Sequence, residues 1–152
     1  EAFVVPNTTT PTNQAIIGQS TGIPNVSYRL WCTTVGNGEL AFWGTTTGSS
    51  FDWSAQAVSS GITWVIGQEY HVAADKDSSG KVRVYRDGVM VGSATPTNSA
   101  LFDANAVLSI GMGGLADRSW NGWLKEVRVT KGVARYASDS GFTPPTAAFP
   151  RW

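Results

Sequence analysis

The sequence has little charge and almost no cysteine. Only 14% of its 152 residues are Asp, Glu, Lys or Arg, and the 11 acidic and 11 basic side chains give a formal net charge of zero. Lysine and glutamate normally build helix surfaces, so their scarcity beside 17 glycines favours an all-β protein. No run of lysine or arginine supplies the electrostatic signature of a nucleic-acid-binding protein, and we expect no nucleic-acid partner.

Two further shortages argue against disulfide cross-links and membrane insertion. Cys32 is the single cysteine and has no partner for an internal disulfide, and the apolar strand pattern around it predicts a buried thiol. No apolar run approaches the roughly 20 residues that span a bilayer, so we expect no membrane insertion. Because the chain begins at Glu1 rather than methionine, we expect residues 1–152 to be one domain excised from a longer polypeptide.

Short alternations of apolar and polar residues recur along the chain, and no stretch of a dozen residues keeps a helical period. The predicted strands are 2–5, 14–19, 26–35, 39–44, 62–66, 69–75, 81–86, 89–94, 106–111 and 122–130. Many short strands of this kind predict a two-sheet antiparallel sandwich or jelly roll.

Asn37-Gly38 predicts a two-residue type I′ hairpin, in which both residues take positive φ. This turn would pair Val35 with Leu40. It would also put Trp31 on the core face and Trp43 on a mixed face together with Leu30 and Cys32.

Asp87-Gly88 predicts a second hairpin of the same type, with Tyr85 opposite Met90 and Val84 opposite Val91. An earlier turn over residues 77–80 joins the preceding strand, so these segments form a three-stranded meander.

Five motifs follow one another in the second half of the chain. They are Tyr-His-Val-Ala at 70–73, Val-Tyr-Arg-Asp-Gly-Val at 84–89, Leu-Ser-Ile-Gly at 108–111, the stretch from Trp120 to Tyr136, and Phe-Thr-Pro-Pro-Thr at 142–146. In this order they resemble laminin-G-like domains of the concanavalin A-like lectin/glucanase superfamily, in the version common in tailed-phage virion and bacterial surface proteins. The resemblance implies a jelly roll that binds glycans or proteins at its concave face or rim loops. Glu69 stands where the family usually has an aromatic residue, and Trp64 is the candidate to fill that volume.

Catalysis is the first chemistry to test, because the same superfamily contains glycoside hydrolases that use two carboxylates. The glutamates are Glu1, Glu39, Glu69 and Glu126, and they show no paired spacing. Asp75 and Asp77 have a suitable spacing, but the turn explains them. A Glu39/Glu69 pair from separate strands stays open. The single histidine, His71, is interpreted as structural, since no nucleophile motif accompanies it.

Calcium is the second possibility. Residues 75–80 begin like a calcium loop, but position 12 is Arg86 where a bidentate glutamate is required. We expect no required cofactor. The resemblance nevertheless implies calcium in rim loops as an alternative, with Asp52, Asp103 and Asp117 as available carboxylates.

Glycan binding is the third possible function, and it is the interpretation we favour. Sugar rings stack on aromatic side chains while Asp, Asn and Arg bind their hydroxyls. The candidate ligand-binding residues combine these types in two loops and one strand: Trp43, Asp52, Trp53, Asp117, Arg118, Trp120 and Asn121. Trp123 is expected in the core.

The sequence therefore predicts a non-catalytic carbohydrate- or receptor-binding module of a larger surface or phage virion protein such as a tail fibre. Its expected location is a virion or cell surface. Its expected partners are a glycan or cell-surface receptor and other virion or surface-protein domains. One alternative is a structural or decoration domain that makes protein contacts in a virion, and a weaker one is a glycoside hydrolase.

Overall fold

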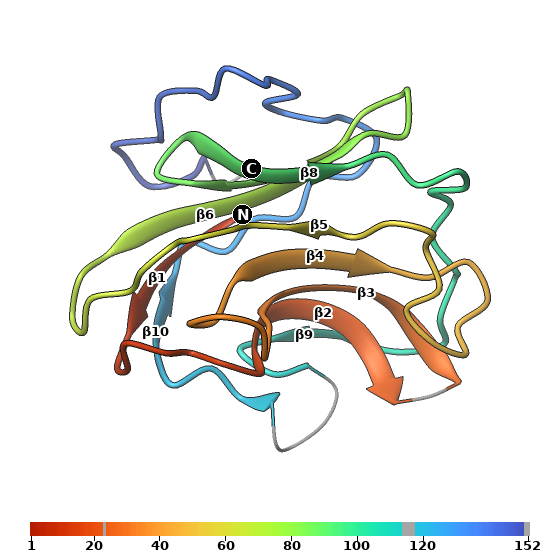
Figure 1. Ribbon diagram of the computed structural model, residues 1–152, viewed down its shortest axis with the longest axis horizontal. Coiled ribbons are helices and arrows are strands. Elements are labelled where there is room, and N and C mark those ends of the chain that lie inside the picture. Colours follow the sequence, from red (N-terminus) through yellow and green to blue (C-terminus); the bar gives the residue numbers. More distant parts are fainter. Residues whose placement is uncertain (23, 114–117, 151–152) are drawn as a thin grey trace.

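The computed structural model describes residues 1–22, 24–113 and 118–150, and these contain ten strands and no α-helix (Figure 1). None of the described residues belongs to a helix capable of crossing a membrane. The strands are β1 (Ala2–Pro6), β2 (Gln14–Gly22), β3 (Asn25–Cys32), β4 (Leu40–Gly44), β5 (Ala57–Val58), β6 (Tyr70–Lys76), β7 (Val82–Arg86), β8 (Val89–Ala94), β9 (Leu108–Ile110) and β10 (Gly122–Lys125).

The strands form two antiparallel sheets that pack face to face. Sheet A has the order β10-β1-β6-β7-β8, and sheet B has the order β5-β4-β3-β2-β9. At one side of the sandwich β5 lies against β8. Gly92 of β8 allows the two strands to approach closely, because a Cβ atom at this position would clash with the backbone of Val58 in β5. At the other side β9 and β10 are the edge strands. The predicted two-sheet antiparallel jelly roll is confirmed.

Alternate residues of both sheets fill the space between them, as period-two strands require. The buried apolar side chains of this core include Val4, Ile17, Leu30, Cys32, Leu40, Trp53, Trp64, Val72, Val84 and Trp120. Cys32 is fully buried, as predicted, and burial raises the pKa of its thiol.

Nine of the ten predicted strands are present, and 62–66 is the exception. This segment keeps the alternation of a strand, but it lies on the connection that crosses from sheet B to sheet A rather than within a ladder. Trp64 is 2% exposed and packs edge-on against Tyr70, with ring centroids 5.2 Å apart. Glu69 is exposed and forms an ion pair with Lys125.

The predicted two-residue turn at Asn37-Gly38 is wrong. Positive φ falls on Gly36 and Gly38 rather than on Asn37, so residues 33–39 form a longer loop. Cys32 then pairs with Leu40, which is three positions from the predicted register. A register shift by an odd number of residues moves the side chains of one strand to the opposite face of the sheet. Leu30 and Cys32 therefore point into the core and Trp31 to the outer face.

The second predicted hairpin has the expected turn, with Asp87 at φ 51° and Gly88 at φ 79°. Tyr85 pairs with Met90 as predicted. A β-bulge follows, so Val84 pairs with Gly92 instead of Val91.

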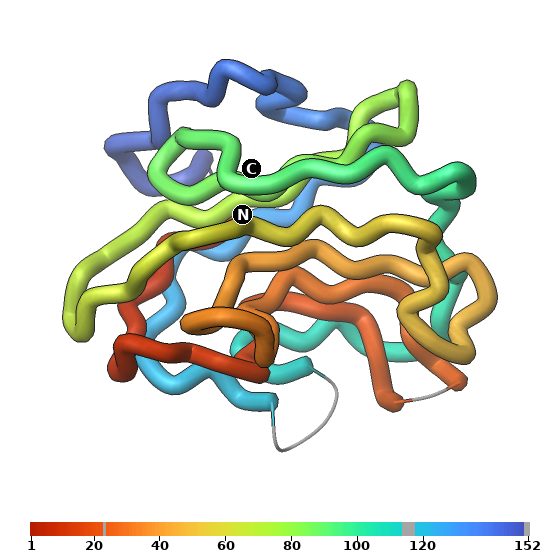
Figure 2. Tube along the Cα trace, in the orientation of Figure 1, coloured from red at the N-terminus to blue at the C-terminus, as the bar shows by residue number. Residues whose placement is uncertain are grey.

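Residues 126–150 cross the outer face of sheet A, and Figure 2 shows this segment, in blue, beside the strands of that sheet. Tyr136 and Phe142 stack with their ring planes 4° apart, and Phe142 packs edge-on against Tyr85 with centroids 5.1 Å apart. Trp123, expected in the core, is 73% exposed, because it alternates with Leu124 on edge strand β10 and Leu124 takes the inward position. That expectation was wrong.

Candidate functional site

The outer face of sheet B carries aromatic and cationic side chains together. On β3, Leu30 and Cys32 point inward, so Arg29 and Trp31 point outward. Trp43 of β4 lies on the same outer face, edge-on to Trp31 with ring centroids 4.5 Å apart. Strand alternation thus collects two indoles and a guanidinium group on one surface.

Two chain segments flank this surface and enclose a pocket. Phe51, from the loop 45–56, packs edge-on against Trp43 at 5.4 Å, and Gly113 contacts Arg29 from the other side. The pocket between them has a volume of about 200 Å³, and we call it the sheet B pocket. Its lining residues are Ser20, Gly22, Val26, Arg29, Trp43, Phe51 and Arg118.

Arg29 is 3% exposed although it carries a charge. Its Nη2 donates to the Gly113 carbonyl at 2.6 Å, and its guanidinium carbon lies 5.4 Å and 5.1 Å from the ring centroids of Trp31 and Phe51. A hydrogen bond and cation–π contacts of this kind offset the cost of burying a cation. Glycine is required at 113 for this approach, because a Cβ there would be 2.9 Å from Arg29 Nε.

Arg118 contributes the second guanidinium group. Its Nη1 donates to Asn13 Oδ1 at 2.5 Å, and its guanidinium carbon lies 5.7 Å from the centroid of Trp31. Arginine stays protonated at every physiological pH. The wall of the sheet B pocket therefore carries two permanent positive charges and, among the described lining residues, no acid.

The predicted residues of the loop 45–56 have other roles than lining this pocket. Asp52 accepts hydrogen bonds from Thr47 Oγ1 and the Thr46 amide, which lower its pKa to about 2 and shape its own loop. Trp53 is 5% exposed, and its Nε1 donates to the Ala100 carbonyl at 2.9 Å. Its ring lies against Gly44, which anchors the loop to the core.

The predicted cluster at residues 117–121 contributes one residue to the pocket. Arg118 lines the pocket, whereas Trp120 is 8% exposed and packs edge-on against Trp64 in the core. Asn121 is exposed, and its amide donates to Gln14 Oε1 at 2.8 Å. Asp117 lies outside the described residues. Of the seven candidates, Trp43 and Arg118 thus line one pocket.

Sequence reasoning missed Arg29 and Phe51 as pocket residues. A single arginine within the apolar segment 26–35, two positions before a tryptophan, was the available signal for Arg29. The incorrect hairpin register concealed it, because that register turned Leu30 outward. Phe51 lay inside the Phe-Asp-Trp motif, but its neighbours Asp52 and Trp53 were chosen instead.

The carboxylates considered for catalysis are occupied elsewhere. Glu39 is 7% exposed and accepts hydrogen bonds from Ser59 Oγ and the Gly61 amide, while Glu69 pairs with Lys125. Asp77 accepts hydrogen bonds from Ser79 Oγ within the predicted turn and from Arg83 of β7, and these bonds lower its pKa. Within residues 1–22, 24–113 and 118–150, no three His, Cys, Asp or Glu side chains gather as a metal site would require.

His71 belongs to a buried polar cluster on the outer face of sheet A. It is 2% exposed, and its Nε2 lies 3.0 Å from Glu1 Oε2. Tyr136 Oη and Arg128 Nε also donate to the Glu1 carboxylate. Burial alone would raise the pKa of Glu1, but these hydrogen bonds outweigh it and lower the pKa to about 2. The cluster fastens the segment 126–150 to sheet A.

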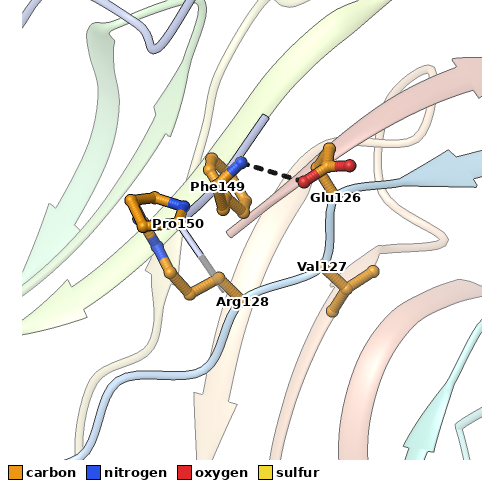
Figure 3. A pocket seen from close by; sticks show the side chains of 5 residues that line it. All are labelled: Glu126, Val127, Arg128, Phe149 and Pro150. Atoms are coloured by element: carbon orange, nitrogen blue, oxygen red, sulfur yellow. Dashed lines mark hydrogen bonds between the residues drawn. The ribbon is translucent and has the colours of Figure 1, made fainter. Parts of the chain in front are cut away.

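A second pocket, of about 340 Å³, lies beside this cluster and is lined by Glu126, Val127, Arg128, Phe149 and Pro150 (Figure 3). Glu126 accepts a hydrogen bond from the Phe149 amide at 2.9 Å, and the Arg128 guanidinium lies 4.0 Å from the Phe149 ring centroid. Both charged side chains thus hold the C-terminal segment in place, so we regard the sheet B pocket as the better candidate.

Two antiparallel five-stranded sheets packed face to face form the architecture of lectin-like β-sandwich domains. The chain belongs to the concanavalin A-like lectin/glucanases superfamily, whose laminin G family model matches residues 1–136. No curated protein matches the sequence. Domains of this lectin type generally bind carbohydrates or receptors and are usually non-catalytic.

Proposed function

We propose that the protein is a non-catalytic carbohydrate-binding module whose ligand occupies the sheet B pocket. The observation that carries this proposal is the presence of Trp43 and Phe51 beside Arg29 and Arg118 in one pocket. Sugar rings present C–H faces that stack on aromatic side chains, and their hydroxyls accept hydrogen bonds from guanidinium groups. Membership of a lectin-type superfamily supports the same function.

The proposal includes the setting of the module. The ending Lys131–Tyr136 followed by Phe142–Thr146 resembles tailed-phage virion and bacterial surface proteins. This supports a module of a larger virion or cell-surface protein, such as a tail fibre, that recognises a glycan or a receptor.

The lining of the sheet B pocket favours binding over turnover. Glycoside hydrolysis needs two carboxylates on either side of the scissile bond, and the described lining residues of the sheet B pocket include none. For the same reason we propose that ligand binding does not require calcium, which takes most of its ligands from carboxylates. A screen for polysaccharide degradation and a titration in EDTA test these two statements.

The test of the site combines a glycan array with isothermal titration of the bound glycan. Trp43→Ala and Phe51→Ala should each weaken binding about tenfold or more, since truncating a central aromatic contact typically costs about 2 kcal/mol. Trp123→Ala is the matched control, because Trp123 is 73% exposed on β10 and does not line the pocket. Near-UV circular dichroism confirms that each variant is folded.

Two results would contradict the proposal. One is an array without a saturable glycan signal. The other is an affinity that Trp123→Ala lowers and the two pocket substitutions leave unchanged.

A second candidate function is a structural or decoration domain that makes protein contacts in a virion. Exposed apolar side chains on the edge strands β9 and β10 favour it: Leu108 is 46%, Ile110 55% and Trp123 73% exposed. Edge strands offer unpaired backbone groups to a partner strand. If this function holds, sedimentation velocity will detect self-association or co-assembly with neighbouring domains, and Trp123→Ser will reduce it.

A further inference from the structure

Strand β9 is the open edge of sheet B. The other edge strand of this sheet, β5, lies against β8. Leu108 and Ile110 of β9 are 46% and 55% exposed. Ile110 pairs with Ile17, whose side chain belongs to the core. Because alternate residues of a strand share a face, Leu108 and Ile110 both lie on the inner face of the sheet. The edge of β9 thus leaves two inward-facing apolar side chains that one further strand could cover.

The backbone groups that point away from sheet B belong to the same two residues. The Gly111 amide donates to the Ile16 carbonyl at 2.8 Å, which makes these two a hydrogen-bonded pair of the β2–β9 ladder. Bonded and non-bonded pairs alternate along an antiparallel ladder, so Ser109 turns its amide and carbonyl toward β2, whereas Leu108 and Ile110 turn theirs outward. Among the described residues, neither Leu108 nor Ile110 forms a backbone hydrogen bond outside the strand ladders.

The edge of β9 also has no charged side chain. Residues 104–116 contain no Asp, Glu, Lys or Arg and no proline, whereas β10 carries Lys125. Lysine and proline are the residues that commonly keep edge strands from pairing. In a two-fold contact, side chains near the axis meet their own copies, so a charge there would face a like charge. The absence of charge therefore makes this edge complementary to a second copy of itself.

One register pairs every residue of β9 with a residue of the β9 strand in a second copy. It is centred on Ser109, so that Leu108 of each copy lies opposite Ile110 of the other. This register joins the outward amides and carbonyls of Leu108 and Ile110 in hydrogen-bonded pairs. It also brings their inward-facing side chains together, which removes the exposed apolar surface from water.

We infer that β9 is a dimerisation edge, at which two copies of the chain pair antiparallel about Ser109 and join their two B sheets into one continuous sheet. The two-fold axis of such a pair is perpendicular to the sheet, so both outer faces of sheet B lie on the same side. The two sheet B pockets then face one surface, and a surface that displays many ligands can engage both of them. The inference concerns a partner, and it holds whichever ligand the pocket binds.

The first experiment measures self-association of the chain by sedimentation velocity over a range of concentrations. The original chain should shift from monomer to dimer as the concentration rises. Ile110→Lys should raise the dimer dissociation constant tenfold or more, because it places a charge at the edge. Val133→Lys is the matched control, since Val133 is a 64% exposed apolar residue outside β9 and should leave the dissociation constant unchanged.

A second variant tests the backbone contribution. Ile110→Pro removes an amide that points outward, so the ladder with β2 keeps its hydrogen bonds while pairing with a second copy is blocked. It should weaken the dimer at least as much as Ile110→Lys. Near-UV circular dichroism confirms that both variants are folded.

A cysteine tests the register directly. In the pairing about Ser109, the two Ser109 residues form a non-hydrogen-bonded pair with Cα atoms about 4.5 Å apart, a distance that a disulfide can span. Under mild oxidation Ser109→Cys should form a covalent dimer at least tenfold faster than Leu108→Cys, whose copies are not opposite each other. Cys32 is fully buried and does not compete.

Three results would overturn the inference. One is a monomer at every concentration, and another is equal cross-linking of Ser109→Cys and Leu108→Cys. The third is a dimer that Ile110→Lys leaves intact and Trp123→Ser dissociates, which would place the contact on β10 instead. None of these results touches the proposed carbohydrate-binding function, because its titrations measure the pocket of each copy separately.

Discussion

At the residue scale, the Glu1 carboxylate shows how one buried charge links distant parts of the chain. Its side chain is 5% exposed and contacts His71 of β6 as well as Arg128 and Tyr136 of the C-terminal segment. Its pKa of about 2 lies below the ordinary value of 4.5. A group whose pKa is lower in the folded state stabilises the protein above its unfolded pKa, and this contribution is lost as the pH falls.

The free energy of unfolding should therefore decrease between about pH 5 and pH 2. In Glu1→Gln this pH dependence should be smaller by on the order of 2 kcal/mol, because the titrating group is gone. Urea denaturation at pH 7 and pH 3 measures the difference. Glu69→Gln, at an exposed carboxylate just before β6, is the control variant. Identical pH dependence in Glu1→Gln and the original chain would contradict the assignment.

At the scale of elements, the sequence predicted strands well and register poorly. Period-two alternation is a local property, so nine of ten strands followed from it. Register depends on which residue of a turn takes positive φ, and Gly36 rather than Asn37 does so. The resulting error placed Trp31 on the core face and Leu30 and Cys32 on the mixed face, the reverse of the structure. Local sequence patterns could not predict the sheet B pocket either, because its lining residues come from β2, β3 and two segments distant in sequence that contain Phe51 and Arg118.

The loop 45–56 depends on a glycine in β4. The indole of Trp53 occupies the space where a side chain at Gly44 would begin, with Cη2 2.7 Å from an added Cβ. Gly44→Ala should lower the free energy of unfolding by about 1–3 kcal/mol, the usual cost of overpacking a core. Thermal and urea denaturation measure this cost.

A double-mutant cycle identifies the cause. Trp53→Phe removes the outer ring of the indole, so Gly44→Ala should cost clearly less in that background. An equal cost in both backgrounds would show that the indole is not the group that excludes a methyl side chain.

At the scale of the whole molecule, the outer faces of the two sheets differ in how the rest of the chain covers them. The outer face of sheet A lies under residues 126–150, whose aromatic stack of Tyr136 and Phe142 packs on Tyr85. The outer face of sheet B is left with a pocket between its flanking segments. The family model ends at residue 136, so part of the covering of sheet A lies beyond it.

This covering should contribute to global stability. Phe142→Ala should cost about 2 kcal/mol, because it removes a half-buried ring that contacts Tyr136, Tyr85 and His71. Thr143→Ala, at an exposed neighbour, should stay within about 0.5 kcal/mol of the original chain. Urea midpoints measure both, and equal midpoints for the two variants would contradict the role of the stack.

The contacts of Phe3 with Phe149 and of Glu1 with Arg128 hold both ends of the described chain on the outer side of sheet A. The sheet B pocket opens on the opposite face of the sandwich. A biosensor chip or bead that tethers the protein through its C-terminal end therefore presents the pocket to the solution. Tethering through a cysteine introduced on β2 or β4 would instead turn the pocket toward the support.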